Sequence, residues 1–130
     1  LWAAAETHVG RGKNHHLAKT YLIGYSKTMN TILRTEIFDI WLAKLKDARG
    51  KARIIERIRS AERGNFSDCE SVGQGVSEMR IHFGPGYRVY FSRIGPVVYV
   101  LLCGGTKRGQ KRDISKAQEM AKLLLKEEEP

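Results

Sequence analysis

Cationic side chains and a tyrosine alternate with apolar residues near the middle of the chain. Arg80 and His82 do so along one run, and Arg88 and Tyr90 do so along the next. Arginine pairs with phosphate oxygens and stabilises the charge that develops on them. Histidine has an unperturbed pKa near 6.5, so it can transfer protons near neutral pH. These residue types together are suited to binding phosphate groups and to transferring protons.

Two strands must carry these side chains. Period-2 alternation predicts strands at residues 76–83 and 87–93, each with one buried and one open face. Between them, Gly84-Pro85-Gly86 predicts a type II turn, in which proline takes the first central position and glycine the second.

A loop of this length also predicts the register of the two strands. The expected pairs are Phe83 with Tyr87, His82 with Arg88, and Arg80 with Tyr90. Directly paired residues share a face. The open face is therefore expected to carry a compact cationic cluster of Arg80, His82, Arg88 and Tyr90.

A third strand, at residues 97–103, is nearly all apolar, which predicts a central strand covered on both faces. It is expected to end at Gly104-Gly105. Function tends to lie at strand exits and in loops. The basic residues that follow are therefore expected to border the open face; they are Lys107, Arg108, Lys111 and Arg112.

Two helices, joined tightly as an antiparallel hairpin, are expected before these strands and after a short strand at residues 30–34. Thr35 and Asp47 are their expected N-caps, and Gly64-Asn65 ends the second helix. The apolar face of the first helix is predicted to consist of Ile37, Ile40, Trp41 and Leu45, widened by Phe38 and Leu42. The second helix carries an arginine-rich face, including Arg53 and Arg57, which is either a solvated face or an RNA contact.

The remaining segments complete an α+β pattern. Residues 66–75 are expected to form a polar loop, and a C-terminal helix is expected from residue 110 or 113. Residues 1–28 have no clear period and are expected to be a poorly ordered N-terminal extension, ahead of one domain at 29–130.

Composition bounds the class of protein. Among 130 residues, 23 Lys and Arg against 14 Asp and Glu give a net charge of +9, which favours RNA, DNA or an acidic protein segment as partner. Cys69 and Cys103, with no disulfide framework, are expected to be free thiols in a reducing compartment. No apolar run approaches a membrane span or a secretory signal, so a cytoplasmic protein is expected.

Four segments resemble the RelE/ParE toxin superfamily, and within it the RelE/HigB-type addiction module killer proteins of phage-related origin. The segments are FDIWLAKLKD (38–47), ARIIERIRSAERGNF (52–66), VGQGVSEMRIHFGPGYRVYF (72–91) and LLCGGTKRGQKRDISKA (101–117). The resemblance implies a small twisted antiparallel sheet with an N-terminal helical hairpin and a C-terminal helix, with the helices on one face. It also implies the toxin of a type II toxin–antitoxin system. Such a toxin is a ribosome-dependent endoribonuclease (an mRNA interferase) that cleaves translated mRNA and is silenced by an antitoxin protein.

The resemblance also implies site residues. Arg88 lies in the Gly-Tyr-Arg segment that recurs in these toxins, and Arg108 best matches a phosphate-binding arginine of the RelE type. The expected catalytic residues are Arg80, His82, Arg88, Lys107 and Arg108. The expected RNA-binding residues are Tyr90, Lys111, Arg112, Arg53 and Arg57.

The pattern departs from RelE proper at one position. Ile114 stands six residues beyond Arg108, where RelE carries a catalytic tyrosine. Tyr90 or His82 could take over proton transfer, or the ribosome could position the substrate without a side-chain base. The resemblance implies that the 2′-hydroxyl of the RNA is the nucleophile, so no metal and no cofactor is expected. The alternative reading is a ParE-like toxin, which is not an enzyme and inhibits DNA gyrase by contact.

Overall fold

The computed structural model describes residues 29–128, and side chains as far as residue 124. The prediction of a separate extension at residues 1–28 lies outside this range. In chain order the elements are β1 (Thr31–Arg34), α3 (Glu36–Lys44), α4 (Ala48–Glu62), β2 (Cys69–Gly73), β3 (Val76–Ile81), β4 (Tyr87–Gly95), β5 (Val98–Thr106), a 3-10 turn η2 (Lys107–Gly109) and α5 (Gln110–Glu128). The α+β class is confirmed.

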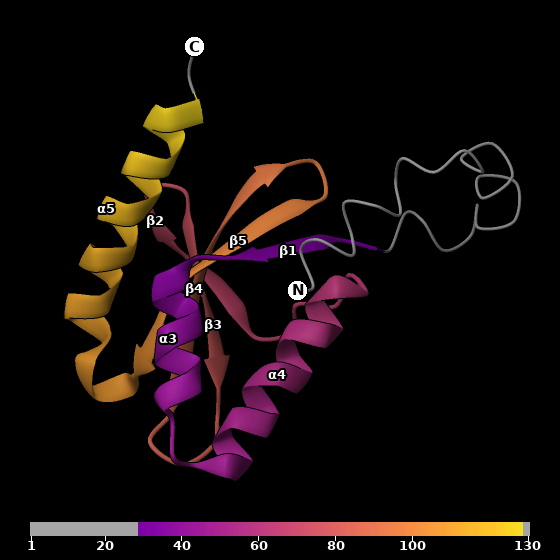
Figure 1. Cartoon of the computed structure of the whole chain (residues 1–130), viewed down its shortest axis with the longest axis vertical. Coiled ribbons are helices and arrows are strands. Elements are labelled where there is room, and N and C mark those ends of the chain that lie inside the picture. The colour runs from indigo at the N-terminus through magenta and orange to yellow at the C-terminus, as the bar shows by residue number, and fades with distance from the viewer. Residues whose placement is uncertain (1–28, 129–130) are drawn as a thin grey trace, which may run out of the picture.

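The five strands form one mixed sheet in the order β1-β5-β4-β3-β2 (Figure 1). Three neighbouring pairs are antiparallel, but β1 runs parallel to β5. The expected antiparallel sheet is therefore wrong at this edge. As predicted, β5 is an interior strand, with Val100, Leu101, Leu102 and Cys103 all buried.

The helices lie on both faces of the sheet (Figure 1). On one face, α3 packs against β5, and α4 packs against β1 and β3. On the other face, α5 covers β5, β4 and β3. The expectation of helices on a single face is wrong because Val76, Val100 and Leu102 form a second apolar surface, which Ala117 and Ala121 of α5 cover.

Local signals explain where α3 and α4 begin. The Thr35 hydroxyl accepts a hydrogen bond from the Phe38 amide at 3.0 Å, and the Asp47 carboxylate accepts one from the Gly50 amide at 3.0 Å. Both predicted N-caps are confirmed. The expected apolar face of α3 is wrong in part. Its buried side is centred on Phe38 and Leu42, whereas Ile37 and Ile40 are 44% and 47% exposed.

The connection between β3 and β4 differs from the predicted type II turn. The closing hydrogen bond runs from the Gly86 amide to the Phe83 carbonyl, at 3.0 Å, so Pro85 takes the second central position. Gly84 takes the first, with a φ of +56°, which suits glycine, whereas a type II turn needs its positive φ at the second position. The strand β3 then ends at Ile81, which pairs with Tyr87.

The observed register shifts the expected pairs by two residues. Arg80 pairs with Arg88, and Glu78 pairs with Tyr90. A shift of two preserves the faces, because successive side chains alternate. Arg80, Arg88 and Tyr90 therefore share one face, as predicted, but His82 lies outside the strand.

Segments expected to be irregular are strands in two places. Residues 69–73, within the predicted polar loop, form the edge strand β2 beside β3. Gly104 and Gly105 lie inside β5 and do not end it. A Cβ at Gly104 would meet the Trp41 ring at 2.4 Å, so this glycine lets α3 pack directly on the strand. Between residues 29 and 128, no helix has the length and apolar character of a membrane span.

Candidate functional site

A buried carboxylate organises the face of the sheet that lies under α5. Glu78, in the middle of β3, is 0% exposed. Its carboxylate accepts hydrogen bonds from the Tyr90 hydroxyl at 3.0 Å, from the Gln110 side chain at 2.7 Å and from Arg80 Nε at 3.0 Å. Arg88 Nε lies 3.8 Å from the same carboxylate. These five residues are called the Glu78 cluster below.

Arg88 is an interior residue of this cluster. It is 5% exposed, and its guanidinium donates hydrogen bonds to the carbonyls of Gly86, at 3.1 Å, and Tyr87, at 3.4 Å. The prediction that Arg88 lies on an open face is wrong, because α5 covers that part of the sheet. An arginine in this position neutralises Glu78 and holds the strand ends, which is a structural role.

Arg80 lies at the border of the cluster and faces three carboxylates. It forms ion pairs with Asp68, with Glu70 of β2 and with Glu78. Two arginines, Arg80 and Arg88, thus lie among three carboxylates. The positive charge of the predicted cationic cluster is therefore neutralised by these acidic groups. The sequence-based reasoning missed Glu70 because β2, which pairs Glu70 with Glu78, was expected to be loop.

Tyr90 is also buried, at 0% exposed, so it presents no ring for a base to stack on. Burial raises the pKa of its hydroxyl far above the usual value, and the hydrogen bond to Glu78 raises it further. Such a hydroxyl stays protonated near neutral pH, and its proton is used in the hydrogen bond to Glu78. Of the two side chains considered for proton transfer, the structure leaves only His82 accessible.

His82 lies just beyond β3, with 71% of its side chain exposed. Its Nε2 atom is 2.5 Å from an Asp68 carboxylate oxygen. The hydrogen bond from His82 lowers the pKa of Asp68, with a smaller contribution from the charge of Arg80. Asp68 is thus ionised near neutral pH and orients the imidazole through Nε2.

The basic residues after β5 are exposed. Lys107 and Arg108 belong to η2, and Lys111 and Arg112 belong to the first turn of α5. Arg112 makes a long ion pair, at 3.8 Å, with Asp113. Ile114, at the position where RelE proper has a tyrosine, packs against the apolar cluster under α5.

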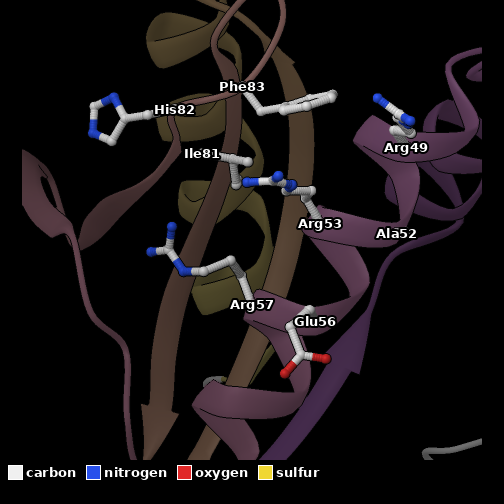
Figure 2. Close-up of a pocket in the computed structure, with 8 residues that line it drawn as sticks. All are labelled: Arg49, Ala52, Arg53, Glu56, Arg57, Ile81, His82 and Phe83. Atoms are coloured by element: carbon white, nitrogen blue, oxygen red, sulfur yellow. The ribbon is translucent and has the colours of Figure 1, made fainter.

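Arg53 and Arg57 border a pocket of about 660 Å³ between α4 and the end of β3 (Figure 2). Arg57 donates hydrogen bonds to the carbonyls of Phe66, at 3.0 Å, and Arg80, so it fastens the chain before β2 to β3. The Arg53 guanidinium lies over the Phe83 ring, 4.6 Å from its centroid. The full lining is Arg49, Ala52, Arg53, Glu56, Arg57, Ile81, His82 and Phe83. Arg49 belongs to the arginine-rich face that the sequence predicts for this helix, whereas Phe83 was not among the predicted site residues.

The pocket and the basic start of α5 lie at the same end of the sheet. The Tyr87 hydroxyl donates a 2.8 Å hydrogen bond to Asp47, the residue that caps α4. In the β3–β4 turn, one residue before Tyr87, a Cβ at Gly86 would meet the Lys107 side chain at 3.2 Å. A continuous path thus runs from α4 across the β3–β4 turn to η2. The basic end, as we call it, comprises Arg49, Arg53, Lys107, Arg108, Lys111 and Arg112.

These positions separate the predicted site residues into two groups. Arg80, Arg88 and Tyr90 belong to the Glu78 cluster, whereas His82, Arg53 and the four cations after β5 are exposed. Arg57 belongs to neither group, because its guanidinium is held by backbone carbonyls. Within residues 29–128 no three acidic, histidine or cysteine side chains gather as a metal site. What the surface group can do chemically is bind a polyanion and transfer a proton beside it.

No family model matches the chain. A search of curated proteins finds an uncharacterized protein of Haemophilus influenzae (strain Rd) that is 47% identical over 93 residues. The match covers 72% of this chain and 94% of the Haemophilus protein. Identity of this extent over nearly the whole relative means a common fold and common descent. The chain belongs to the same family as this uncharacterized Haemophilus influenzae protein.

Proposed function

We propose that this chain is the toxin of a type II toxin–antitoxin system, with a RelE-like fold, and that it cleaves translated mRNA on the ribosome. The observation that carries the proposal is the exposed His82–Asp68 pair at the same end of the sheet as the basic end. Histidine supplies proton transfer, and the cations supply phosphate binding. The net charge of +9 and the resemblance of the four segments support the same class.

The proposed reaction uses the 2′-hydroxyl of the RNA as nucleophile and needs no metal. His82 accepts the proton of this hydroxyl as its oxygen attacks phosphorus, and the 5′-oxygen leaves with a proton from solvent or the ribosome. Lys107 and Arg108 stabilise the negative charge that gathers on the phosphorane oxygens. The products are a 2′,3′-cyclic phosphate and a free 5′-hydroxyl.

Asp68 acts as a positioning residue in this scheme. A carboxylate at Nε2 holds the imidazole in the tautomer whose Nδ1 accepts a proton. Arg80 binds the other oxygen of Asp68, at 3.5 Å, and thereby links the Glu78 cluster to the reactive histidine. Arg80 and Arg88 then serve the reaction by holding β2, β3 and β4 in register.

Partners and location follow from the same proposal. Translated mRNA and ribosomes place the reaction in the cytoplasm. A cognate antitoxin with an acidic or amphipathic segment silences the toxin, since a basic surface attracts acidic partners. The interaction should weaken as salt screens these charges.

Mapping of mRNA 5′ ends after induced expression tests the function. We expect new ends at fixed positions within codons, only on translated messages. The His82→Gln variant, expressed at the same level, is the matched control, because His82 is exposed and its loss should leave the fold intact. Cuts that persist on untranslated RNA, or in the His82→Gln strain, would contradict the proposed mechanism.

A second candidate is the ParE-like toxin that binds DNA gyrase without chemistry. This candidate is favoured by the ion pairs that neutralise Arg80 and Arg88 within the protein. A toxin that acts by contact alone needs no cluster of catalytic arginines. Intact messages together with trapped gyrase–DNA adducts after induction would select this candidate.

A further inference from the structure

We propose that the pocket between α4 and the end of β3 binds one nucleotide of single-stranded RNA, with its base stacked on the Arg53–Phe83 pair. The proposal deepens the proposed function, on which it rests for the choice of RNA as ligand. The proposed subsite would bind a base, whereas the rest of the basic end can bind RNA only through its phosphates. The residues that carry it are Arg49, Arg53, Glu56 and Phe83 (Figure 2).

The stacking platform is already assembled. The Arg53 guanidinium lies 4.6 Å from the centroid of the Phe83 ring. No hydrogen bond or ion pair ties this guanidinium to another residue between 29 and 124. Unstacked RNA bases bind to arginine planes and aromatic rings in this manner. A surface arginine held only by a ring is therefore free to bind a second flat group.

The walls of the pocket are built to keep their shape. Arg57 forms one side, and its hydrogen bonds to the Phe66 and Arg80 carbonyls hold it against β3. Ile81 is 3% exposed and provides an apolar floor. A volume of about 660 Å³ lies within the range, roughly 300–1,000 Å³, of pockets that hold small organic ligands. One nucleotide fits such a space.

The charges orient the ligand and favour RNA over an acidic peptide. Arg49 and Arg53, which both line the pocket, can bind a phosphate beside it. Glu56, one turn further along α4, points away from the Phe83 ring in Figure 2, and its charge repels the carboxylates of an acidic peptide. A flat, cationic platform suits the base and the phosphate of one nucleotide.

Binding of a fluorescein-labelled RNA decamer, followed by anisotropy, tests the proposal. Phe83→Leu keeps the charge and much of the volume but removes the ring. It should weaken binding about 5- to 150-fold, because one base stack contributes roughly 1–3 kcal/mol. Phe83→Tyr keeps the ring and should bind within about twofold of the parent. Arg53→Ala should also weaken binding, and this exposed residue can be changed without threatening the fold.

Arg59→Ala is the charge-matched control, since Arg59 is an exposed arginine of α4 that does not line the pocket. Equal losses in Arg53→Ala and Arg59→Ala, with Phe83→Leu like the parent, would overturn the proposal. A polyglutamate peptide should bind more weakly than the RNA and be indifferent to Phe83→Leu. If the peptide loses affinity in that variant and the RNA does not, the pocket binds an acidic protein and the proposal is wrong.

The same variants separate this inference from the proposed function. If the parent cleaves translated mRNA while Phe83→Leu binds and cleaves normally, the subsite fails and the function stands. If the parent protein cleaves no mRNA, but the Phe83→Leu variant binds RNA more weakly than the parent does, the subsite stands and the proposed reaction fails.

Discussion

The Glu78 cluster and the basic end contain the same kinds of side chain, but their surroundings give them opposite roles. In the cluster, Arg88 is 5% exposed and lies against the carboxylate of a glutamate that is 0% exposed. At the basic end, the Arg53 guanidinium lies over the Phe83 ring, and Arg108 is exposed. An arginine beside a buried carboxylate holds the fold together, whereas one without such a partner keeps its charge for a ligand.

The largest expected effect concerns the centre of the cluster. Glu78→Ala removes the carboxylate that Arg88, Arg80, Tyr90 and Gln110 share, and it leaves Arg88 buried without its counter-charge. Removing one partner of a buried ion pair typically costs about 3–5 kcal/mol of stability. Urea denaturation of the variant should show this loss of unfolding free energy.

Glu119→Ala is the control for that experiment. Its pairing with Lys122, at 3.9 Å, lies at the surface, so the change should stay within about 0.5 kcal/mol. A Glu78→Ala protein as stable as the Glu119→Ala protein would contradict a structural role for the cluster.

The second effect concerns chemistry at the surface. His82→Gln should reduce reporter mRNA cleavage by about 10²-fold or more, the usual contribution of a general base, while the melting temperature falls only slightly, because the His82–Asp68 pair lies at the surface. Arg88→Ala should instead lower the melting temperature. Any loss of cleavage in this variant should follow from its lower stability. If Arg88→Ala abolishes cleavage in a fully folded protein, the division between the two regions breaks down.

A smaller effect sharpens the electrostatic side of the comparison. Arg108→Gln and Lys111→Gln should each reduce the slope of log affinity for RNA against log salt by about 1, since each removes one phosphate contact. Arg93→Gln is the control, because Arg93 lies near the far end of β4 and donates hydrogen bonds to the Gly95 and Pro96 carbonyls. An equal change of slope in all three variants would mean that binding has no preferred surface.

The smallest effect is a pH dependence at the junction of the two regions. The hydrogen bond from His82 holds the pKa of Asp68 below its ordinary value in the folded state. Such a group stabilises the fold at pH values above its unfolded pKa, and this stabilisation is lost as the pH falls through the folded pKa. At pH 7 the parent should therefore be more stable than Asp68→Asn, and the difference should disappear in acid. A difference that grows below pH 4 would contradict the assignment.

Much of the local structure could be predicted because its causes are local. The caps at Thr35 and Asp47 satisfy amides three residues away, so the chain near each helix start contains the whole signal. The alternation that separates Arg80 and Arg88 from Met79 and Val89 depends only on the pleat of a strand. Both kinds of prediction were confirmed even though the turn and the register were wrong.

The site was harder to predict because exposure depends on what packs from elsewhere in the chain. β2 has no alternating apolar pattern, because an edge strand with one polar face buries few side chains. Since this strand was not predicted, nothing in the sequence indicated that Glu70 lies beside Arg80. Arg88 and Tyr90 look like surface residues until α5 is placed over them. The pocket requires α4 and the end of β3 to meet, which no single segment encodes.

The sequence by itself determined the helices and strands other than β2, the helix caps, the faces of β3 and β4 and the basic character of the chain, because each follows from neighbours within a few residues or from composition. Only the tertiary structure decided which cations are free. Glu78, Arg88 and Gln110 lie on three different elements, and a carboxylate neutralises an arginine only when the fold brings the two within a few ångströms in a place that water does not reach.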